Sequence, residues 1–356
     1  MTGREPIGIL TFHRCINHGS YWQARCLADG LRARGRAAVI LDHRCERADG
    51  AERACALEPT LPTPVPSGDR PRYHAKLLKF QRAISGLPLS AAFDLHDPSR
   101  MPPLDTVVVG SDEVWNLRHP WYGGATAFFG AGIPARRLVS YAASFGNYDA
   151  ADGLEQRWSD SLRAFVAIAV RDDNSRAIVA DALGEMPSMV LDPCLQFPAD
   201  PEGAWEGPDE PFAAVYGHNF SDEFAREVRR WATARGLPLV SIGYRNDWAD
   251  VQWLEAGPHD FAHAMARASA VATNFFHGCV FALRNERPFV CEASPYRGTK
   301  VRGLVSQVGA EHRLVDAGTP SSEYDRRLRE PVEPAVVRRI GLLRQRSARY
   351  LDAALG

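Results

Sequence analysis

The stretch Ala270-Val-Ala-Thr-Asn-Phe-Phe-His-Gly-Cys-Val-Phe-Ala-Leu283 contains the junction around which the chain is organised. Residues 269–273 predict a short buried strand, and residues 278–284 predict an apolar helix. His277 falls between them, where backbone N–H groups and the helix dipole favour anions. This stretch alone is compatible with a histidine that only fills a crowded turn and with one that transfers protons beside a bound anion.

The same alternation of strand and helix extends outward in both directions. A stretch with four prolines, five acids and two glycines, residues 197–211, predicts a linker between two such runs. The predicted strands before it are 6–12, 37–41, 105–109, 137–140 and 166–170, and those after it are 212–216, 237–242, 269–273 and 288–291. Two consecutive alternating halves predict an α/β protein with two Rossmann-like domains facing across a cleft.

The domain boundaries follow from this pattern. We expect an N-terminal α/β domain over residues 1–195, a C-terminal α/β domain over 210–320, and a helical segment over 321–356. Two irregular insertions, 43–70 and 87–103, flank a predicted basic helix at 72–85. The first is rich in proline and predicts a mobile loop. The two insertions either form a wall of an acceptor site or a protein contact, or they decorate the surface.

Composition restricts the class of protein. The 356 residues are 45% hydrophobic and 24% charged, which is globular, and the formal net charge of −1 gives no basis for binding nucleic acid or an anionic membrane. Seven cysteines form no CxxC pair and no zinc-type spacing, as expected in a reducing compartment. The sequence shows no apolar signal region and no apolar run of about 18 residues, so we expect a soluble cytoplasmic protein without an integral membrane segment.

Polar turns follow several of the predicted strands. Asn17, Gly19 and Ser20 lie where the first strand leads into a helix, and they can hold an anion or a sugar hydroxyl or simply cap that helix. No GxGxxG is present, so there is no dinucleotide fingerprint. Asp112 follows the strand 105–109, where ligands gather in open α/β sheets. It can orient a histidine, accept a hydroxyl proton, or cap a helix.

Arg171 stands at the end of the strand 166–170. A guanidinium there is a plausible bidentate clamp for a phosphate or a carboxylate. Pairing with Asp172, Asp173 or another acid is an equal alternative.

Six separated motifs, taken in order from about residue 7 to residue 310, resemble those of the polysaccharide pyruvyl transferase family. They are Gly8-Ile-Leu-Thr with Asn17-His-Gly-Ser and Gln23-Ala24, Gly110-Ser-Asp-Glu-Val-Trp-Asn116, Ser140-Tyr-Ala-Ala-Ser-Phe-Gly146, Val170-Arg-Asp with Ser175, Val190-Leu-Asp-Pro193, and Phe276-His-Gly-Cys-Val-Phe-Ala282. The resemblance implies a glycosyltransferase-B-like fold. It also implies transfer of a pyruvyl group from phosphoenolpyruvate, as a co-substrate, onto hydroxyls of a sugar or glycan precursor.

The resemblance assigns roles to particular residues. His277, in its Phe-His-Gly context, corresponds to the family's catalytic histidine, and Asp112 is the second expected catalytic residue. In characterised members an arginine lies two residues before the histidine, where this chain has Phe275. The residues expected to bind the donor are Arg171, Gly278, Arg297 and Lys300. Arg171 lies in the predicted N-terminal domain, and the other three lie in the C-terminal domain. Those expected on the acceptor side or in the cleft are Asn17, Gly19, Ser20, Ser111, Asn116 and Ser144.

The chemistry implied by the resemblance requires no metal and no bound cofactor, and the expected partners are a small-molecule donor and a sugar-like acceptor. Two alternatives remain at this point. One is a group transferase of the same fold with a nucleotide-linked donor, and the other is a family member that has lost catalysis and works as a binding subunit.

Overall fold

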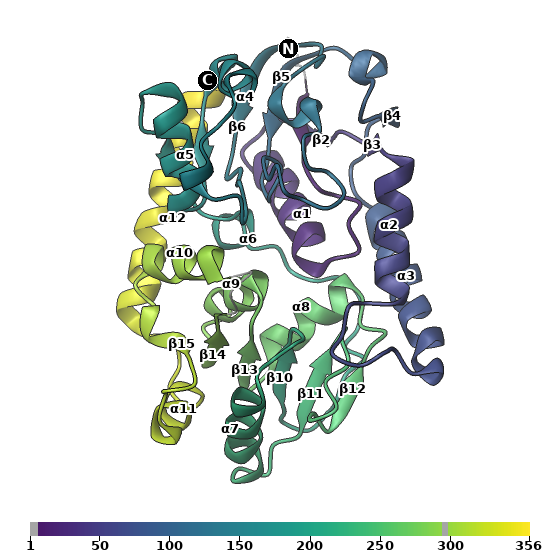
Figure 1. The fold of residues 1–356 in the computed structure, drawn as a ribbon, viewed down its shortest axis with the longest axis vertical. Helices are drawn as coiled ribbons and strands as arrows, with labels where there is room; N and C mark the ends of the chain where they lie inside the picture. Colours follow the sequence, from purple (N-terminus) through teal and green to yellow (C-terminus); the bar gives the residue numbers. More distant parts are fainter. Residues whose placement is uncertain (1–5, 294–297) are drawn as a thin grey trace. The chain divides into compact units, whose positions relative to one another are not determined.

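A computed structural model describes residues 6–293 and 298–356, which form two compact units (Figure 1). The first unit comprises the described residues of Met1–Glu52 together with Ile84–Ala199 and Gly341–Gly356. The second comprises Arg53–Ala83 and the described residues of Asp200–Ile340. Each unit is built on its own parallel sheet, which confirms the expected α/β class with two Rossmann-like domains.

The sheet of the first unit has the strand order β2-β1-β5-β6-β7, and all its pairings are parallel. Two short parallel pairs, β3 with β4 and β8 with β9, extend its carboxyl edge. The strands are β1 Ile7–Leu10, β2 Ala38–Ile40, β3 His43–Arg44, β4 Phe93–Asp94, β5 Leu104–Val109, β6 Ala135–Ser140, β7 Phe165–Ala167, β8 Ala169–Val170 and β9 Ser188–Met189.

Helices connect these strands and cover the sheet. The first of them starts after Asn17, whose side-chain oxygen accepts hydrogen bonds from the first-turn N–H groups of Gly19 and Ser20. The helices of this unit are α1 His18–Ala33, the first part of α2 Glu46–Leu57, α4 Gln156–Arg163, α5 Asp173–Leu183, α6 Pro193–Gln196 and the second part of α12 Pro334–Leu355.

The second unit has a sheet of order β12-β11-β10-β13-β14-β15, again with parallel pairings throughout. Its central strands β10 and β13 are completely buried, as expected for a parallel sheet covered on both faces. The strands are β10 Ala213–Tyr216, β11 Leu239–Ile242, β12 Val251–Trp253, β13 Ala270–Thr273, β14 Phe289–Glu292 and β15 Leu314–Val315.

Helix α7 (Asp222–Thr233) of the second unit is strongly amphipathic. In α7, the buried residues Phe224, Val228 and Trp231 recur at helical spacing and pack on the sheet, while Ser221 caps the N-terminus. The described helices are α3 Arg70–Ser85, α7 Asp222–Thr233, α8 Pro258–Arg267, α9 Phe276–Arg284, α10 Gly298–Val308, α11 Ser321–Arg327 and the first part of α12. Most of α3 belongs to this unit, because the segment Arg53–Ala83 contains all but its last two residues.

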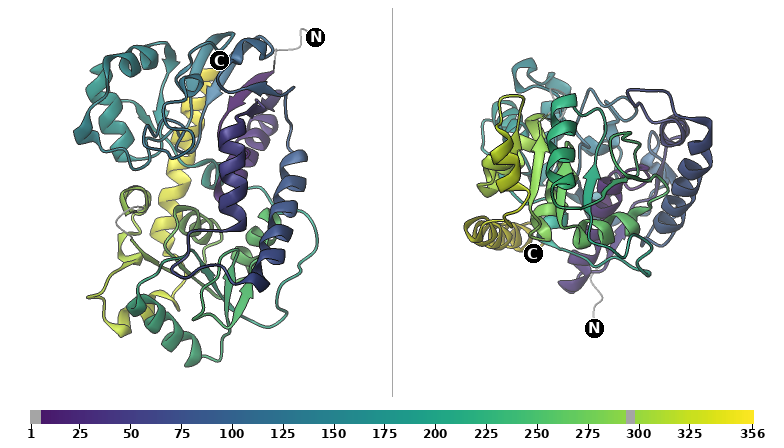
Figure 2. Two further views of the ribbon diagram at one scale, coloured as in Figure 1. Left: turned by 45° about the vertical axis from the view of Figure 1, so that its right-hand side comes forward. Right: turned by 90° about the horizontal axis from the view of Figure 1, so that it is seen from below.

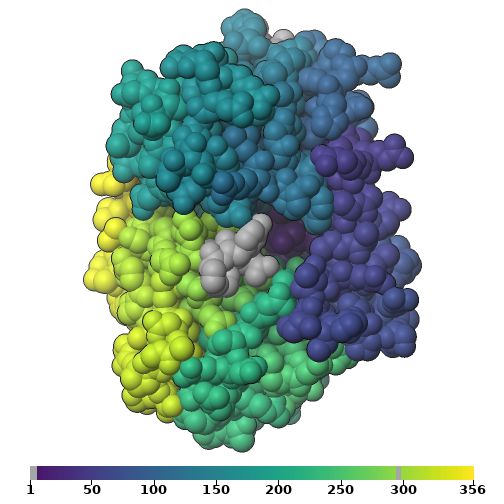
Figure 3. Space-filling view, in the orientation of Figure 1, coloured from purple at the N-terminus to yellow at the C-terminus, as the bar shows by residue number. Residues whose placement is uncertain are grey.

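The segment 53–83 differs most from the expectation. It was predicted to belong to the N-terminal domain, but it clusters with the second unit, and Figure 2 shows α3 running beside β12 and α8. Two ion pairs fix it there: Arg72 Nε to Glu255 Oε2 (2.8 Å) and Lys79 Nζ to Asp260 Oδ2 (2.7 Å). The outward-facing side chains of α3 lie at the surface (Figure 3).

Two other expectations need correction. Residues 46–57 form the helix α2 rather than part of a loop, because their alanines and charged residues favour a helix even without a clear apolar stripe. The C-terminal helix α12 is not a separate segment: from Gly341 onward it belongs to the first unit, where the Tyr350 hydroxyl donates to Ser140 O (2.7 Å). None of the helices in the two described ranges has the length and apolarity needed to span a membrane.

Candidate functional site

Polar side chains gather at the carboxyl edge of the first sheet. All strands of this sheet are parallel, so their carboxyl ends share one edge. The turn after β5 comes close to the chain after β6, and a side chain at Gly110 would collide with the carbonyl oxygen of Tyr141. Glycine at this position therefore allows Ser111 and Asp112 to reach the centre of the edge.

Asp112 is the centre of this polar group. It has a left-handed backbone (φ 72°), a conformation that an aspartate tolerates better than most residues. Its Oδ2 accepts a hydrogen bond from the Ser20 hydroxyl (2.8 Å), and its Oδ1 accepts one from Arg171 Nη2 (3.0 Å). Three segments far apart in sequence thus meet at one carboxylate.

Arg171 also binds a second acid. Its Nη1 donates to Asp192 Oδ2 (3.0 Å), and the exposed fractions of the Arg171, Asp112 and Asp192 side chains are 2%, 10% and 1%. Burial alone would lower the pKa of the guanidinium, but the two carboxylates outweigh burial and raise that pKa above its usual value. Arg171 thus pairs with acids of the chain, which was one of the two alternatives that the sequence left open. A donor-binding role for Arg171 stays a prediction.

Gln23 organises the other side of the group, and we did not predict it as a site residue. Its Oε1 accepts hydrogen bonds from the hydroxyls of Ser111 (2.7 Å) and Thr11 (3.2 Å). Its amide nitrogen donates to the carbonyls of Phe12 and Ser20. The sequence signals for this role are the motif Gln23-Ala24 and the place of Gln23 about one turn after Ser20 in α1.

The remaining predicted residues of this unit shape their own turns. Asn17 caps α1, with Gly19 contributing its backbone N–H to that cap. Asn116 donates to Glu113 Oε2 (2.8 Å) and to Asn147 Oδ1 (2.9 Å). The Ser144 hydroxyl donates to Asp172 Oδ2 (2.6 Å). These contacts hold the edge in shape, and roles in acceptor binding stay predictions.

A second buried group, also missed from the sequence, borders β1. His13 Nε2 lies 3.0 Å from Asp42 Oδ1, and the ring of His43 meets that of His13 edge-on at 4.8 Å. Burial raises the pKa of Asp42, but hydrogen bonds from His13 and Arg14 dominate together and lower it to about 2. Burial and the nearby His13 lower the pKa of His43 to about 3, so His43 is neutral at physiological pH.

Glu52 of α2 approaches the turn after β1. Its Oε2 accepts a hydrogen bond from the backbone N–H of Ile16 (3.1 Å), and its carboxyl group interacts with the Cys15 thiol. Burial raises the pKa of Glu52 to about 7, helped by the negative charges of Asp49 and Asp112. The raised pKa makes this carboxyl group a source of pH-dependent stability.

We expect Glu52→Gln to change how stability depends on pH. The folded state holds the proton between the ordinary pKa near 4.5 and about 7, so the wild-type protein loses up to about 3 kcal/mol of unfolding free energy as the pH rises through this window. Glutamine mimics the protonated acid and removes that loss. Urea unfolding of both proteins at pH 5 and pH 8 measures the difference, and Glu46→Gln on the exposed face of α2 is the control. Equal pH dependence of the Glu52→Gln and wild-type proteins would contradict the prediction.

The second unit places His277 at the carboxyl edge of its own sheet. As predicted, β13 leads directly into α9, although the helix starts at Phe276, two residues earlier than expected. The Thr273 hydroxyl accepts from the Phe275 N–H (3.0 Å) and donates to Tyr216 O (2.6 Å). A side chain at Gly278 would collide with that hydroxyl, so glycine lets the first turn of α9 pack against the end of β13.

Phe275 lies in an aromatic group formed by three neighbouring strand-end turns. Its ring contacts those of Tyr216 (5.1 Å between centroids), His218 (5.3 Å) and Tyr244 (5.4 Å), all edge-on. Position 275, where characterised members have an arginine, is therefore filled by an uncharged aromatic ring packed among other rings.

The other basic residues considered for the donor differ in position. Lys300 lies in the first turn of α10 and is partly buried, whereas Arg297 lies outside the described residues. A further arginine of the second unit, Arg245, pairs with Asp69 and Asp247. The predicted site residues thus form one group in each unit, Asp112 in the first and His277 in the second.

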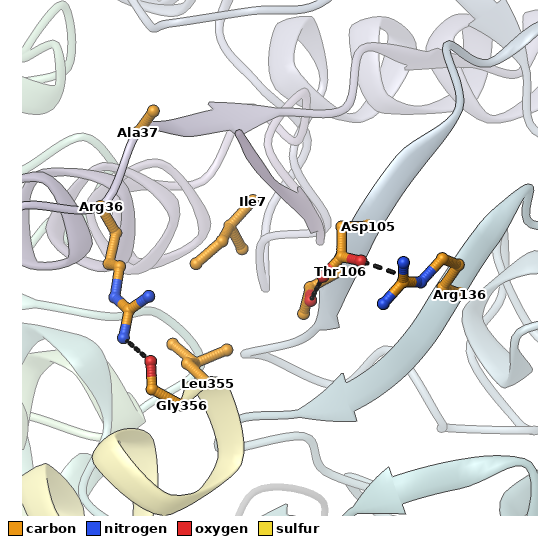
Figure 4. Close-up of a pocket in the computed structure, with 8 residues that line it drawn as sticks. All are labelled: Ile7, Arg36, Ala37, Asp105, Thr106, Arg136, Leu355 and Gly356. Carbon is orange, nitrogen blue, oxygen red and sulfur yellow. Dashed lines mark hydrogen bonds and ion pairs between the residues drawn. The ribbon is translucent and has the colours of Figure 1, made fainter. Parts of the chain in front are cut away.

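The first unit also has a pocket at the opposite, amino-terminal edge of its sheet. Figure 4 shows Arg36 and Arg136 at its two sides, with the start of β5 between them. Arg36 contacts the Gly356 carbonyl at the end of the chain, and Arg136 pairs with Asp105 (3.0 Å). Among the predicted site residues that the structure describes, none lines this pocket.

The two sheets, with polar turns where their parallel strands end, define an α/β protein of the class in which ligands generally bind at the carboxyl ends of the strands. Residues 17–294, well over half of the chain, match the family described as polysaccharide pyruvyl transferase. The chain belongs to this family, and it is a transferase. No curated protein matches the chain significantly.

Solved structures with a similar chain trace include two glycosyltransferases and an epimerase. The glycotransferase of kitacinnamycin is 14% identical, with a TM-score of 0.47 over 99% of this chain and 98% of that one. The UDP-GlcNAc 2-epimerase from Neisseria meningitidis is 10% identical, with a TM-score of 0.47 over 98% and 99%. The glycosyltransferase SsfS6 from Streptomyces sp. SF2575 is 13% identical, with a TM-score of 0.46 over 99% and 98%.

Proposed function

We propose that this protein transfers the pyruvyl group of phosphoenolpyruvate to two hydroxyls of a sugar or glycan precursor, forming a ketal and releasing phosphate. The observation that carries the proposal is the position of His277 at the β13–α9 junction of a chain that belongs to the pyruvyl transferase family. A histidine at the first turn of a helix combines a titratable ring with backbone N–H groups that favour anions.

The proposed reaction balances without an oxidant or a metal. Addition of a proton to the methylene carbon of the donor makes a methyl group and leaves an electron-poor carbon at C2. One acceptor hydroxyl bonds to C2 and loses its proton, the bond between C2 and the phosphate oxygen breaks, and the second hydroxyl completes the ketal. The two acceptor hydroxyls release two protons. One replaces the proton that was added to the methylene carbon, and the other leaves on the phosphate.

His277 is the group proposed to move these protons. General acid–base catalysis needs a side chain that both gives and takes a proton near neutral pH, and histidine is the residue type that does so without a shifted pKa. The Gly278 N–H precedes the first hydrogen bond of the α9 ladder, from Cys279 N to Phe275 O, and is proposed to bind the donor phosphate. Lys300, Arg297 and Arg171 stay candidate donor ligands.

Asp112 is proposed to act on the acceptor. Its carboxyl group is held by Ser20 and Arg171, so that it is positioned to accept a hydrogen bond or a proton from a sugar hydroxyl. The hydroxyls and amides that surround it in the first unit match the polar groups of a sugar.

The test measures donor binding and turnover separately. Calorimetric titration of the full chain with phosphoenolpyruvate and with nucleotide sugars identifies the donor, and phosphate release in the presence of a panel of sugar acceptors identifies the reaction. Saturable phosphoenolpyruvate binding with acceptor-dependent phosphate release is the expected result. Saturable binding of a nucleotide sugar without response to phosphoenolpyruvate would replace the proposal by the nucleotide-donor alternative, and binding without any turnover would favour the non-catalytic one.

A further inference from the structure

Lys76 is a buried lysine on the inner face of α3. The residues Tyr73, Lys76, Leu77 and Phe80 recur at helical spacing and form the buried stripe of this helix. Only 2% of Lys76 is exposed. A lysine inside an apolar stripe is unusual, because the ammonium group loses its hydration there.

The ammonium group of Lys76 lies at the turn after β11. Its Nζ donates one hydrogen bond to Gly243 O (2.8 Å) and sits 4.3 Å from the centre of the Tyr244 ring. Lysine has three N–H donors, and the other two have no acceptor in the described part of the chain. A strand-end carbonyl and an aromatic face stabilise a cation, but neither supplies a negative charge.

The neighbouring cations of the second unit are different. Arg72 pairs with Glu255, Lys79 pairs with Asp260 and Glu206, and Arg245 pairs with Asp69 and Asp247. Lys76, on the same helix as two of them, has no carboxylate partner among residues 6–293 and 298–356. Because a buried charge needs compensation, Lys76 is either neutral or neutralised by an anion that the chain does not supply.

The position of Lys76 points to a ligand rather than to core packing. The Tyr244 ring that it contacts lies 5.4 Å from Phe275 and 5.0 Å from His218, centroid to centroid. These rings belong to the turns after β10, β11 and β13, the last of which continues into His277. The described residues that follow β13, Asn274 to His277, contain no lysine or arginine. Lys76 therefore brings a cationic side chain to the carboxyl edge that carries His277.

We propose that Lys76 is an anion-binding residue of the second unit, whose ammonium group contacts a carboxylate or phosphate oxygen of the donor. The proposal rests on the proposed function, because it takes the donor to bind at this edge. The two remaining N–H bonds of Lys76 and the N-terminal turn of α9 would then share the negative charges of one small ligand.

If Lys76 binds the donor, the affinity for the donor should fall as the pH rises and Lys76 loses its proton. Burial lowers the pKa of Lys76 to about 7, with the Cys55 thiol acting weakly in the opposite direction. The ammonium form dominates below this pKa, and the neutral amine dominates above it. A phosphate group has its second pKa near 6, so a donor phosphate is ionised throughout pH 7–9 and the decline in affinity over that range reports the protein.

Several other titratable or charged groups lie around Lys76. They are Cys55 of α2, Asp69 just before α3, Tyr73 in the first turn of α3, and His218, Tyr244 and Arg245 in the strand-end turns. Asp69 and Arg245 are paired with each other, and burial raises the pKa of Tyr73 to about 12, far above the range tested. A variant at position 76 with a permanent charge therefore separates Lys76 from its neighbours.

The test compares calorimetric binding of phosphoenolpyruvate to the wild-type protein, Lys76→Arg and Lys76→Met at pH 7, 8 and 9. We expect the wild-type dissociation constant to rise about tenfold per pH unit above 7. Lys76→Arg should remove most of that slope, because arginine stays charged, and Lys76→Met should weaken binding at pH 7 by at least about tenfold. Arg82→Met, on the exposed face of α3, is the matched control.

The outcomes separate this inference from the proposed function. Equal slopes for wild type and Lys76→Arg, or unchanged binding by Lys76→Met, would overturn the role of Lys76. If the wild-type protein binds no phosphoenolpyruvate, inorganic phosphate and pyruvate are titrated in the same way. Binding of either anion that Lys76→Met loses would support the anion site while the donor assignment fails, and binding of none would overturn both. Should Lys76→Met not fold, the slope of Lys76→Arg decides.

Discussion

His277→Ala is expected to lower phosphate release from phosphoenolpyruvate by about 10²–10⁴-fold, the usual contribution of a general acid–base residue. The proposed reaction needs proton transfer both to the donor carbon and from an acceptor hydroxyl, and alanine does neither. The loss should appear in kcat more than in donor affinity, because the backbone N–H groups of the α9 turn are unaffected. Steady-state phosphate release at saturating donor and acceptor measures it.

Two further variants make the histidine prediction specific. His277→Gln retains a polar side chain of similar reach but cannot transfer a proton at neutral pH, so it should be nearly as inactive as alanine. Thr273→Val removes the hydroxyl that binds the Phe275 N–H and so disturbs the turn without changing the histidine. A His277→Gln protein with wild-type turnover and normal thermal unfolding would exclude His277 from proton transfer.

The alternation of strands and helices was largely predictable, because long apolar runs determine it. The run at β13 and the apolar helix α9 are both visible in the sequence, and so is the amphipathic α7. Elements with weak local signals were missed: β12 has only three residues, and one of them, Val251, is exposed. The helix α2 escaped prediction because its neighbourhood is dominated by charged residues and prolines.

The location of the candidate site was predictable to a lesser degree. Parallel strands place their carboxyl ends together, so Ser20 and Asp112 were both expected at one edge, and they form a hydrogen bond. Pairings between distant side chains were not predictable, such as Gln23 with Ser111 or His13 with Asp42. Each depends on the register of two segments that the sequence does not relate.

The burial of Lys76 was also not predictable from the sequence. The helix that carries it was predicted with nearly its observed bounds, but a lysine on a basic helix is normally solvated. Its burial depends on α3 belonging to the second unit, and the contacts with Glu255 and Asp260 that place it there join positions more than 170 residues apart.

Arg171→Met is expected to have the largest effect on stability, about 3–5 kcal/mol of unfolding free energy, the range for removing one partner from a buried ion pair. The substitution leaves Asp112 and Asp192 without their shared cation, and both side chains are almost fully buried. Methionine has a similar length, so the loss of packing is small and the uncompensated charge is the main cause. Urea unfolding at pH 7 measures the effect, with Arg163→Met, at a half-exposed ion pair with Asp160, as the control that should change stability by less than about 1 kcal/mol.

A charge-neutral double variant tests whether this cause is correct. If the uncompensated carboxylates are responsible, Arg171→Met combined with Asp192→Asn should recover part of the stability lost by Arg171→Met alone, because one buried charge has been removed. Equal stability of the single and double variants would assign the loss to packing instead. The result also bears on the donor: an arginine whose removal unfolds the first unit cannot be tested as a donor ligand by deletion. Arg171→Lys, which keeps a positive charge, is the variant in which donor binding should then be measured.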